Sequence, residues 1–260
     1  MNEDYKQFGL NLAKKAGNII KANFNLGMKK EWKKDNTPLT ETDLTINQLV
    51  LDSIKKNFPE HSILSEEGDN FKESDEFVWV CDPVDGTIPF SHGIPVSTFS
   101  LALVRNGKSI LGVIYDPFLD RLFFAEKGKG AYLNNKKIAV SKIDNPQESV
   151  IGVEYFLNES YDLLQVINSL RKQQVKVITL TSIAYMGSLV ACGELAATIF
   201  PGRKPHDSAA LKIIVEEAGG KVTDLFGNEQ RYDREIRGHI ISNGKLHNQL
   251  VKLVKENMGL

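Results

Sequence analysis

The chain of 260 residues has the composition of an ordinary globular protein, with 42% hydrophobic and 25% charged residues. Its 32 Lys and Arg nearly balance its 33 Asp and Glu, so nothing favours nucleic acid or a membrane surface as a partner. The opening MNEDYKQFGL lacks the features of a signal peptide, and no apolar run reaches the roughly 20 residues of a membrane helix. We therefore expect a cytoplasmic protein in which Cys81 and Cys192 are free thiols.

The first part of the chain predicts two helices followed by an antiparallel sheet. Apolar residues at helical spacing predict helices over 4–24 and 43–58, with a mobile basic loop over 28–40 between them. Short β-branched or aromatic runs bounded by turn residues predict strands at 62–65, 77–81, 97–105, 110–116 and 121–127. Together these elements predict an α+β N-terminal domain over 1–143.

The polar stretch at 141–149 predicts a boundary, because strands and helices alternate after it. The strands are expected at 149–154, 175–180, 194–200 and 239–243. The helices are expected at 161–173, 183–193, 206–220 and 246–258. Such alternation predicts an α/β C-terminal domain over 144–260, and hence an α/β fold for the whole chain.

Acidic residues recur at the ends of these predicted elements, where sites are commonly built in α/β proteins. They are Asp43, Glu66, Asp82, Asp85 and Asp207. If these ends converge, the carboxylates repel one another, and either protons or a cation must offset the repulsion. Carboxylates without neighbouring His or Cys clusters favour a hard cation with oxygen ligands, which indicates Mg²⁺ rather than zinc.

The stretch CDPVDGT, at 81–87, holds two of these acids close together. Pro83 fixes its own φ and disfavours the α conformation at Asp82, so Asp82 stays extended while the chain turns to bring Asp85 alongside. Gly86 permits a ligand to approach the backbone, and the N–H groups of Gly86 and Thr87 would face an anion at a helix start. These features predict a phosphate site beside a metal, although the same residue types also suit a plain turn.

Four short motifs occur in order along almost the whole chain: TETD (40–43), SEEG (65–68), WVCDPVDGTIPF (79–90) and HDSAALKIIVEEAGG (206–220). Through these motifs the chain resembles the inositol monophosphatase family of Mg²⁺-dependent, lithium-sensitive phosphatases. The resemblance implies a layered αβαβα sandwich of the inositol monophosphatase and fructose-1,6-bisphosphatase type. It also implies a homodimer with two or three Mg²⁺ ions in each active site.

The resemblance assigns metal ligands by motif position. One Mg²⁺ is implied at Glu66, Asp82 and the carbonyl of Val84. A second is implied at Asp82, Asp85 and Asp207. Two such cations would stabilise both the attacking and the leaving oxygen of a displacement at phosphorus.

Catalytic and substrate-binding residues are implied in the same way. Asp43 and Thr87 correspond to the pair that orients and deprotonates the attacking water, and Glu66 is catalytic as a metal ligand. The implied substrate contacts are Asp85, Gly86, Thr87, Ile183 and Asp207.

The chain departs from the family pattern at several positions that bear on the substrate. Phe200 stands where the inositol-specific members have a Glu that binds sugar hydroxyls, which weakens the case for inositol itself. Thr181 replaces a Gly in a loop that meets the substrate. Arg203 and Lys204 would either contact a second anionic group or form part of a solvated loop.

We therefore expect a Mg²⁺-dependent phosphomonoesterase for a small phosphorylated metabolite, with inositol 1-phosphate or a related sugar or polyol phosphate as first candidate. The alternatives within this fold are histidinol phosphate, fructose 1,6-bisphosphate, 3′-phosphoadenosine 5′-phosphate and NADP. An alternative of another class is a regulatory protein that binds the transcription machinery. The complete acidic set argues against this last reading, because a protein released from catalysis could lose one member.

Overall fold

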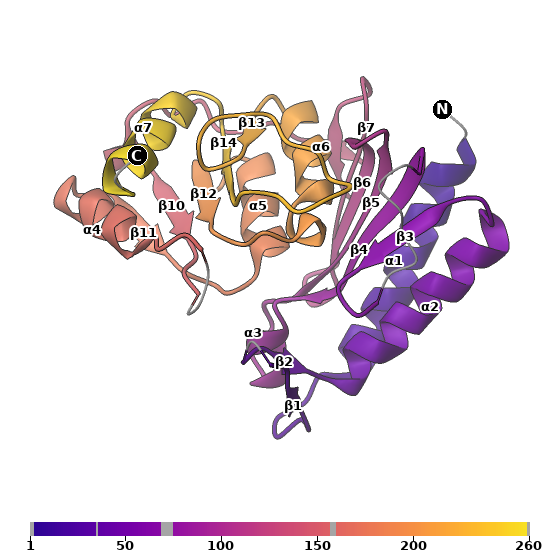
Figure 1. The fold of residues 1–260 in the computed structure, drawn as a ribbon. Coiled ribbons are helices and arrows are strands. Elements are labelled where there is room, and N and C mark those ends of the chain that lie inside the picture. Colours follow the sequence, from indigo (N-terminus) through magenta and orange to yellow (C-terminus); the bar gives the residue numbers. More distant parts are fainter. Residues whose placement is uncertain (1–2, 35, 69–74, 157–159, 259–260) are drawn as a thin grey trace.

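The structure, a computed structural model, describes residues 3–34, 36–68, 75–156 and 160–258. These residues form five layers, in which helices and sheets alternate (Figure 1). A pair of helices covers the outer face of a large sheet, a second pair lies between the two sheets, and a third covers the outer face of the small sheet. This is the αβαβα sandwich that the resemblance implied.

The helices of the three layers are close to the predicted ones. In order through the molecule, the pairs are α1 (Glu3–Asn23) with α2 (Glu41–Asn57), α5 (Ile183–Ala191) with α6 (Ala209–Glu217), and α4 (Leu164–Lys172) with α7 (His247–Asn257). Three short helical segments connect other elements: α3 (Thr87–Ser91), η1 (Pro146–Glu148) and η2 (Pro205–Asp207).

The large sheet contains seven strands in sequential order. They are β3 (Ser62–Ser65), β4 (Phe77–Asp85), β5 (Thr98–Arg105), β6 (Lys108–Asp116), β7 (Arg121–Glu126), β8 (Ala131–Leu133) and β9 (Lys136–Lys137). The expectation of a purely antiparallel sheet is wrong at one edge, because β3 pairs with β4 in parallel. This register places Ile63 beside Trp79, and both side chains are buried in the core beneath α1 and α2.

The small sheet has the order β11-β10-β12-β14-β13 and mixes both directions. Its strands are β10 (Val150–Val153), β11 (Lys176–Ile178), β12 (Ala197–Phe200), β13 (Lys221–Thr223) and β14 (His239–Ser242). β10 pairs in parallel with β11 and β12, whereas β14 is antiparallel to its neighbours. β13 was not predicted from the sequence. Neither was the antiparallel pair of β1 (Glu31–Trp32) with β2 (Pro38–Leu39), which lies within the segment predicted as a mobile loop.

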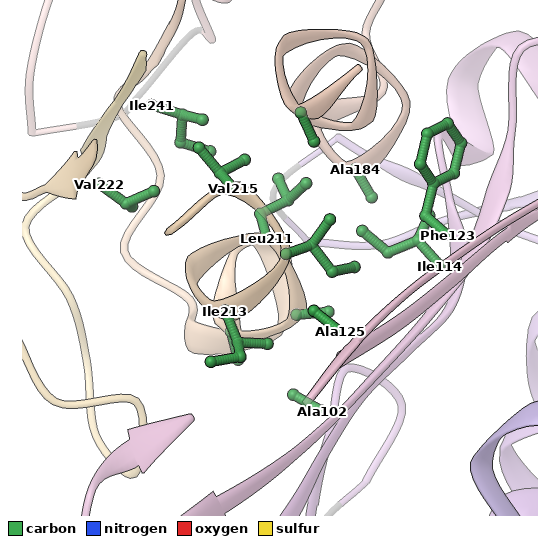
Figure 2. Packing of buried hydrophobic residues seen from close by; sticks show 14 of the residues in the cluster. Ala102, Ile114, Phe123, Ala125, Ala184, Leu211, Ile213, Val215, Val222 and Ile241 are labelled. Atoms are coloured by element: carbon green, nitrogen blue, oxygen red, sulfur yellow. The ribbon is translucent and has the colours of Figure 1, made fainter. Parts of the chain in front are cut away.

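Helix α6 packs against both sheets, as Figure 2 shows for the apolar cluster around it. Leu211 and Val215 of α6 lie in one cluster with Ile114 of the large sheet and Ile241 of the small sheet. Gly112 of β6 permits this close packing, since an added Cβ would lie 2.6 Å from the carbonyl oxygen of Ala210. The two halves therefore share a core, and the division into domains at residue 143 remains a prediction.

Two further expectations concern the chain as a whole. Cys81 is buried and Cys192 is half-buried, and both are free thiols, as predicted. Among the helices of the described residues, none is both long and apolar enough to cross a membrane.

Candidate active site

The predicted site residues come together around one cavity of about 190 Å³. The segments that line it are far apart in sequence: the end of β3, the end of β4, the start of α5, and η2. The predicted residues among its lining are Glu66, Asp82, Val84, Asp85, Gly86, Thr87, Ile183 and Asp207. Asp43 does not line the cavity but is hydrogen-bonded to a residue that does.

A β-bulge brings the two aspartates of the central motif to the same side. β4 continues to Asp85 instead of ending at the predicted residue 81, and its register with β5 shifts between Asp82 and Asp85. Asp82 lies opposite Ser100 and Asp85 opposite Thr98, so three steps on β4 match two on β5. In a regular strand, residues three apart point to opposite faces, and the extra residue of the bulge cancels this alternation.

The cavity places several negative charges close together. Burial raises the pKa of Asp82 well above its ordinary value, and the negative charges of Glu66, Asp85 and Asp207 raise it further. Burial and these charges therefore disfavour the ionised form of the Asp82 carboxyl. A divalent cation in the cavity would favour that ionised form.

Lys33 supplies the positive charge beside Glu66. Its ammonium Nζ lies 2.8 Å from Glu66 Oε1 and also pairs with Glu67. Burial alone would raise the pKa of Glu66, but nearby positive charge lowers it. This charge comes from Lys33, because burial lowers the pKa of His206 to about 4 and leaves its imidazole neutral at pH 7.

Asp43 connects the start of α2 to the central motif. One of its carboxylate oxygens, Oδ2, accepts a hydrogen bond from the backbone N–H of Thr40 at 2.9 Å, which caps the helix. The other oxygen lies 3.2 Å from the hydroxyl of Thr87, which is also 2.9 Å from the carbonyl oxygen of Val84. Because a hydroxyl has a single hydrogen, Thr87 donates to one of these two acceptors at a time.

Asp85 is held in a fixed orientation by donors from two parts of the chain. Its Oδ2 accepts hydrogen bonds from the hydroxyls of Thr98, at 3.0 Å, and of Ser182. Its Oδ1 accepts from the backbone N–H of Ile183 at 2.9 Å, at the start of α5. Burial raises the pKa of Asp85, while these donors favour the ionised form and work against that rise.

Part of the cavity's lining is apolar, with basic residues beside it. The rings of Phe156 and Phe200 pack edge to face, with their centroids 5.4 Å apart. Arg203 and Lys204 line the same cavity and are exposed, and the Arg203 guanidinium lies 3.7 Å from a carboxylate oxygen of Glu235.

The oxygen-rich donor set suits Mg²⁺. Four carboxylates and a backbone carbonyl face the cavity, against one imidazole, that of His206. The geometry is not that of a formed site: in the described part of the chain, no three or more His, Cys, Asp or Glu side chains are already arranged to hold a metal. The raised pKa of Asp82 and the ammonium of Lys33 beside Glu66 are consistent with carboxylates that require added positive charge.

Several residues that contact the carboxylates of this site were not predicted from the sequence. Lys33 lay in the predicted loop, where its only signal was a basic charge between two helices. Thr98 carried no signal, and Ser182 had only its place in the loop implied to meet the substrate, because their contacts to Asp85 depend on tertiary structure.

Comparison with known proteins defines the class. The model of the inositol monophosphatase family matches residues 1–258. A Thermotoga maritima protein named fructose-1,6-bisphosphatase/inositol-1-monophosphatase is 34% identical over 257 residues, covering 97% of this chain and 96% of that protein. A solved structure of a Thermotoga maritima IMPase is 33% identical, covers 98% of both chains and superposes with a TM-score of 0.89.

The fold and these matches define a phosphatase. The chain belongs to the inositol monophosphatase family. Its relatives carry different specific names: a histidinol-phosphatase of Chlorobaculum parvum is 32% identical, covering 95% of both chains. The Nus factor SuhB of Escherichia coli is 29% identical, covering 95% of this chain and 92% of that protein.

Proposed function

We propose that the chain is a Mg²⁺-dependent phosphomonoesterase that acts on a small phosphorylated metabolite in the cytoplasm. The observation that carries this proposal is the convergence of acidic residues from separate segments on one cavity, where burial and mutual repulsion raise the pKa of Asp82. Charges that repel in this way are stabilised by a divalent cation.

The proposed ligands of a first Mg²⁺ are Glu66, Asp82 and the carbonyl of Val84. Those of a second are Asp82, Asp85 and Asp207, and the family resemblance allows a third ion. When bound, Mg²⁺ would lower the pKa of a water molecule and neutralise charge on the phosphoryl group. The hydrogen bonds to Asp85 from Ser182 and Ile183 hold its carboxylate in one orientation before any ion binds.

We assign Asp43 and Thr87 to the handling of the attacking water. Burial raises the pKa of Asp43 to about 6, so this carboxylate is ionised at neutral pH and basic enough to accept a proton. Thr87 lies between Asp43 and the cavity, where its hydroxyl can accept a hydrogen bond from water while it donates to Asp43. Gly86 and Thr87 would contribute backbone N–H groups to the phosphate at the start of α3.

The first candidate substrates are inositol 1-phosphate and related sugar or polyol phosphates. Phe200 offers no hydrogen bond to a sugar hydroxyl, and this leaves histidinol phosphate, fructose 1,6-bisphosphate, 3′-phosphoadenosine 5′-phosphate and NADP as alternatives. The names of the Thermotoga and Chlorobaculum relatives support including the bisphosphate and histidinol phosphate in any test.

Measuring phosphate release from these substrates in the presence of Mg²⁺ tests the proposal and ranks them. We expect turnover of at least one substrate, loss of turnover on chelation of the metal, and inhibition by Li⁺. A folded protein that is inert on all of them with Mg²⁺ present would contradict the proposed function.

A second candidate function is regulation through the transcription machinery, which the name of the Escherichia coli relative favours. Affinity capture with this chain as bait distinguishes the two. Recovery of RNA polymerase subunits by both wild type and Asp82→Asn would support the second function, because such binding does not need the acidic site. If neither protein captures a polymerase subunit, the second candidate function is ruled out.

A further inference from the structure

Glu154 is a buried acid that the proposed mechanism does not use. It directly follows β10, its side chain is buried, and its backbone N–H donates to the carbonyl oxygen of Ile199 at 3.0 Å. Its side-chain Oε1 accepts two backbone hydrogen bonds, from Leu180 at 2.9 Å and from Thr181 at 2.6 Å. Its Oε2 is buried without a hydrogen-bond partner in the described structure. One oxygen of Glu154 thus holds two consecutive amides of the loop that precedes α5.

The second of these amides belongs to a residue in an unfavourable conformation. Thr181 has φ +53°, in the left-handed region that β-branched residues rarely adopt. Such a conformation is unfavourable and persists only where surrounding contacts enforce it. The hydrogen bond to Glu154 is such a contact, and the Thr181 hydroxyl forms another with the carbonyl oxygen of Leu180 at 2.8 Å.

The two residues after Thr181 bind Asp85. Ser182 donates its hydroxyl to Asp85 Oδ2, and Ile183 donates its backbone N–H to Oδ1. If the chain left the left-handed region at Thr181, its direction would change immediately before both donors. The conformation enforced by Glu154 therefore determines where the start of α5 meets Asp85.

We propose that Glu154 is a positioning residue that holds the 180–183 loop so that α5 keeps Asp85 oriented toward the cation. This inference rests on the proposed function, in which Asp85 is a metal ligand. Glu154 acts through the loop and contacts neither substrate nor metal. Replacing a residue that supports a metal ligand in this way typically changes metal affinity or activity by about 10–100-fold.

Three substitutions at this position separate geometry from charge. Glu154→Gln keeps an oxygen that can accept both amides, so we expect kcat and Mg²⁺ affinity within about threefold of wild type. Glu154→Ala removes the acceptor, and Glu154→Asp shortens the side chain so that it no longer reaches both amides. For these two we expect the Mg²⁺ dissociation constant, measured by calorimetry, to rise about 10-fold and kcat to fall about 10–100-fold, with KM changing less.

Hydrogen exchange provides a readout that does not depend on activity. Exchange of the amides of Leu180 and Thr181 should accelerate at least about 10-fold in Glu154→Ala and Glu154→Asp but not in Glu154→Gln. If Glu154→Ala does not fold, the comparison of Asp with Gln decides the question. Equal impairment of the Gln and Asp variants would overturn the inference, and so would wild-type Mg²⁺ affinity in a folded Asp variant.

A second-site substitution tests the role of the strained residue. In Glu154→Ala/Thr181→Gly, glycine adopts the left-handed conformation without strain, so kcat and Mg²⁺ affinity should recover several-fold over Glu154→Ala. If Glu154→Ala impaired the enzyme only by leaving a cavity in the core, Thr181→Gly would not restore kcat or Mg²⁺ affinity. A lack of recovery in the folded double variant would therefore count against the inference. Failure of the proposed function looks different, because wild type itself would then neither bind Mg²⁺ nor release phosphate.

Discussion

At the scale of single residues, Asp82 is the side chain on which the proposed chemistry depends most. We predict that Asp82→Asn lowers kcat/KM at least about 100-fold, because an amide cannot replace a carboxylate shared by two cations. Its melting temperature without Mg²⁺ should stay near that of wild type, because burial and the neighbouring carboxylates disfavour the charged form of Asp82, which the amide also lacks. Calorimetry and phosphate release measure both effects.

Asp116→Asn is a matched control for this substitution. Asp116 is equally buried, accepts a backbone hydrogen bond from Phe118 at 2.9 Å and pairs with Arg121 at 2.8 Å, outside the cavity. The Asp116→Asn substitution should lower the melting temperature, but addition of Mg²⁺ should raise the melting temperature of this variant as much as that of wild type. An Asp82→Asn enzyme that remains active would contradict the metal assignment.

Arg203 and Lys204 line the cavity, where they could contact a second anionic group of a substrate. We predict that Arg203→Gln/Lys204→Gln raises KM for fructose 1,6-bisphosphate about 10-fold, the loss of roughly one charge-assisted hydrogen bond. The KM for inositol 1-phosphate should change less than about twofold. Arg234→Gln, which removes a charge outside the cavity lining, is the control. Unchanged KM values for both substrates would indicate that Arg203 and Lys204 belong to a solvated loop without substrate contact.

At the scale of elements, the turn from β4 into α3 requires glycine for two reasons. Gly86 has φ +82°, and a Cβ there would lie 2.7 Å from the carbonyl oxygen of Val96 and 2.8 Å from Cβ of Ser182. Gly128 has φ +77° but open space around it. In urea unfolding, we predict a loss of about 1 kcal/mol for Gly128→Ala and about 2–4 kcal/mol for Gly86→Ala. Equal losses of unfolding free energy in the two variants would show that the close contacts of a Cβ at position 86 do not destabilise the fold.

The junction of β10 with the 180–183 loop predicts a pH-dependent stability. Burial raises the pKa of Glu154 from 4.5 to about 7, although the Thr181 and Leu180 amides lower it. The folded state holds the Glu154 proton more tightly than the unfolded state does. Protonated Glu154 therefore contributes to the free energy of unfolding fully below about pH 4.5, and this contribution is lost as the pH rises through about 7. In urea unfolding, the stability of wild type relative to Glu154→Gln should therefore fall by about 2–3 kcal/mol between pH 5 and 8. A constant difference would contradict the shifted pKa.

At the scale of the whole molecule, we predict a homodimer, as the family resemblance implies. Light scattering coupled to size-exclusion chromatography should give about twice the chain mass of 29.0 kDa. A mass equal to that of one chain across micromolar concentrations would contradict this prediction.

The sequence predicted those features that depend on local pattern. The helical spacing predicted α1 and α2 within about two residues, and three of the four motifs hold the carboxylates that share the cavity, whereas Asp43 of TETD lies outside its lining. It could not predict contacts between distant residues. Ser182 binds Asp85 across 97 positions and Glu154 binds Thr181 across 27, and neither pairing leaves a periodic signal. The bulge after Asp82 was missed because strand pairing with β5, rather than residue type, extends β4 beyond residue 81.

The central claim is that Glu66, Asp82, Asp85 and Asp207 form one cation site. The most direct measurement is anomalous diffraction from crystals soaked in Mn²⁺, which has the same preference for oxygen ligands as Mg²⁺. The account predicts at least one strong peak in the cavity, with carboxylate oxygens of Asp82 and of a second acid at coordination distance. Well-ordered crystals with Mn²⁺ bound elsewhere and none among these carboxylates would contradict it.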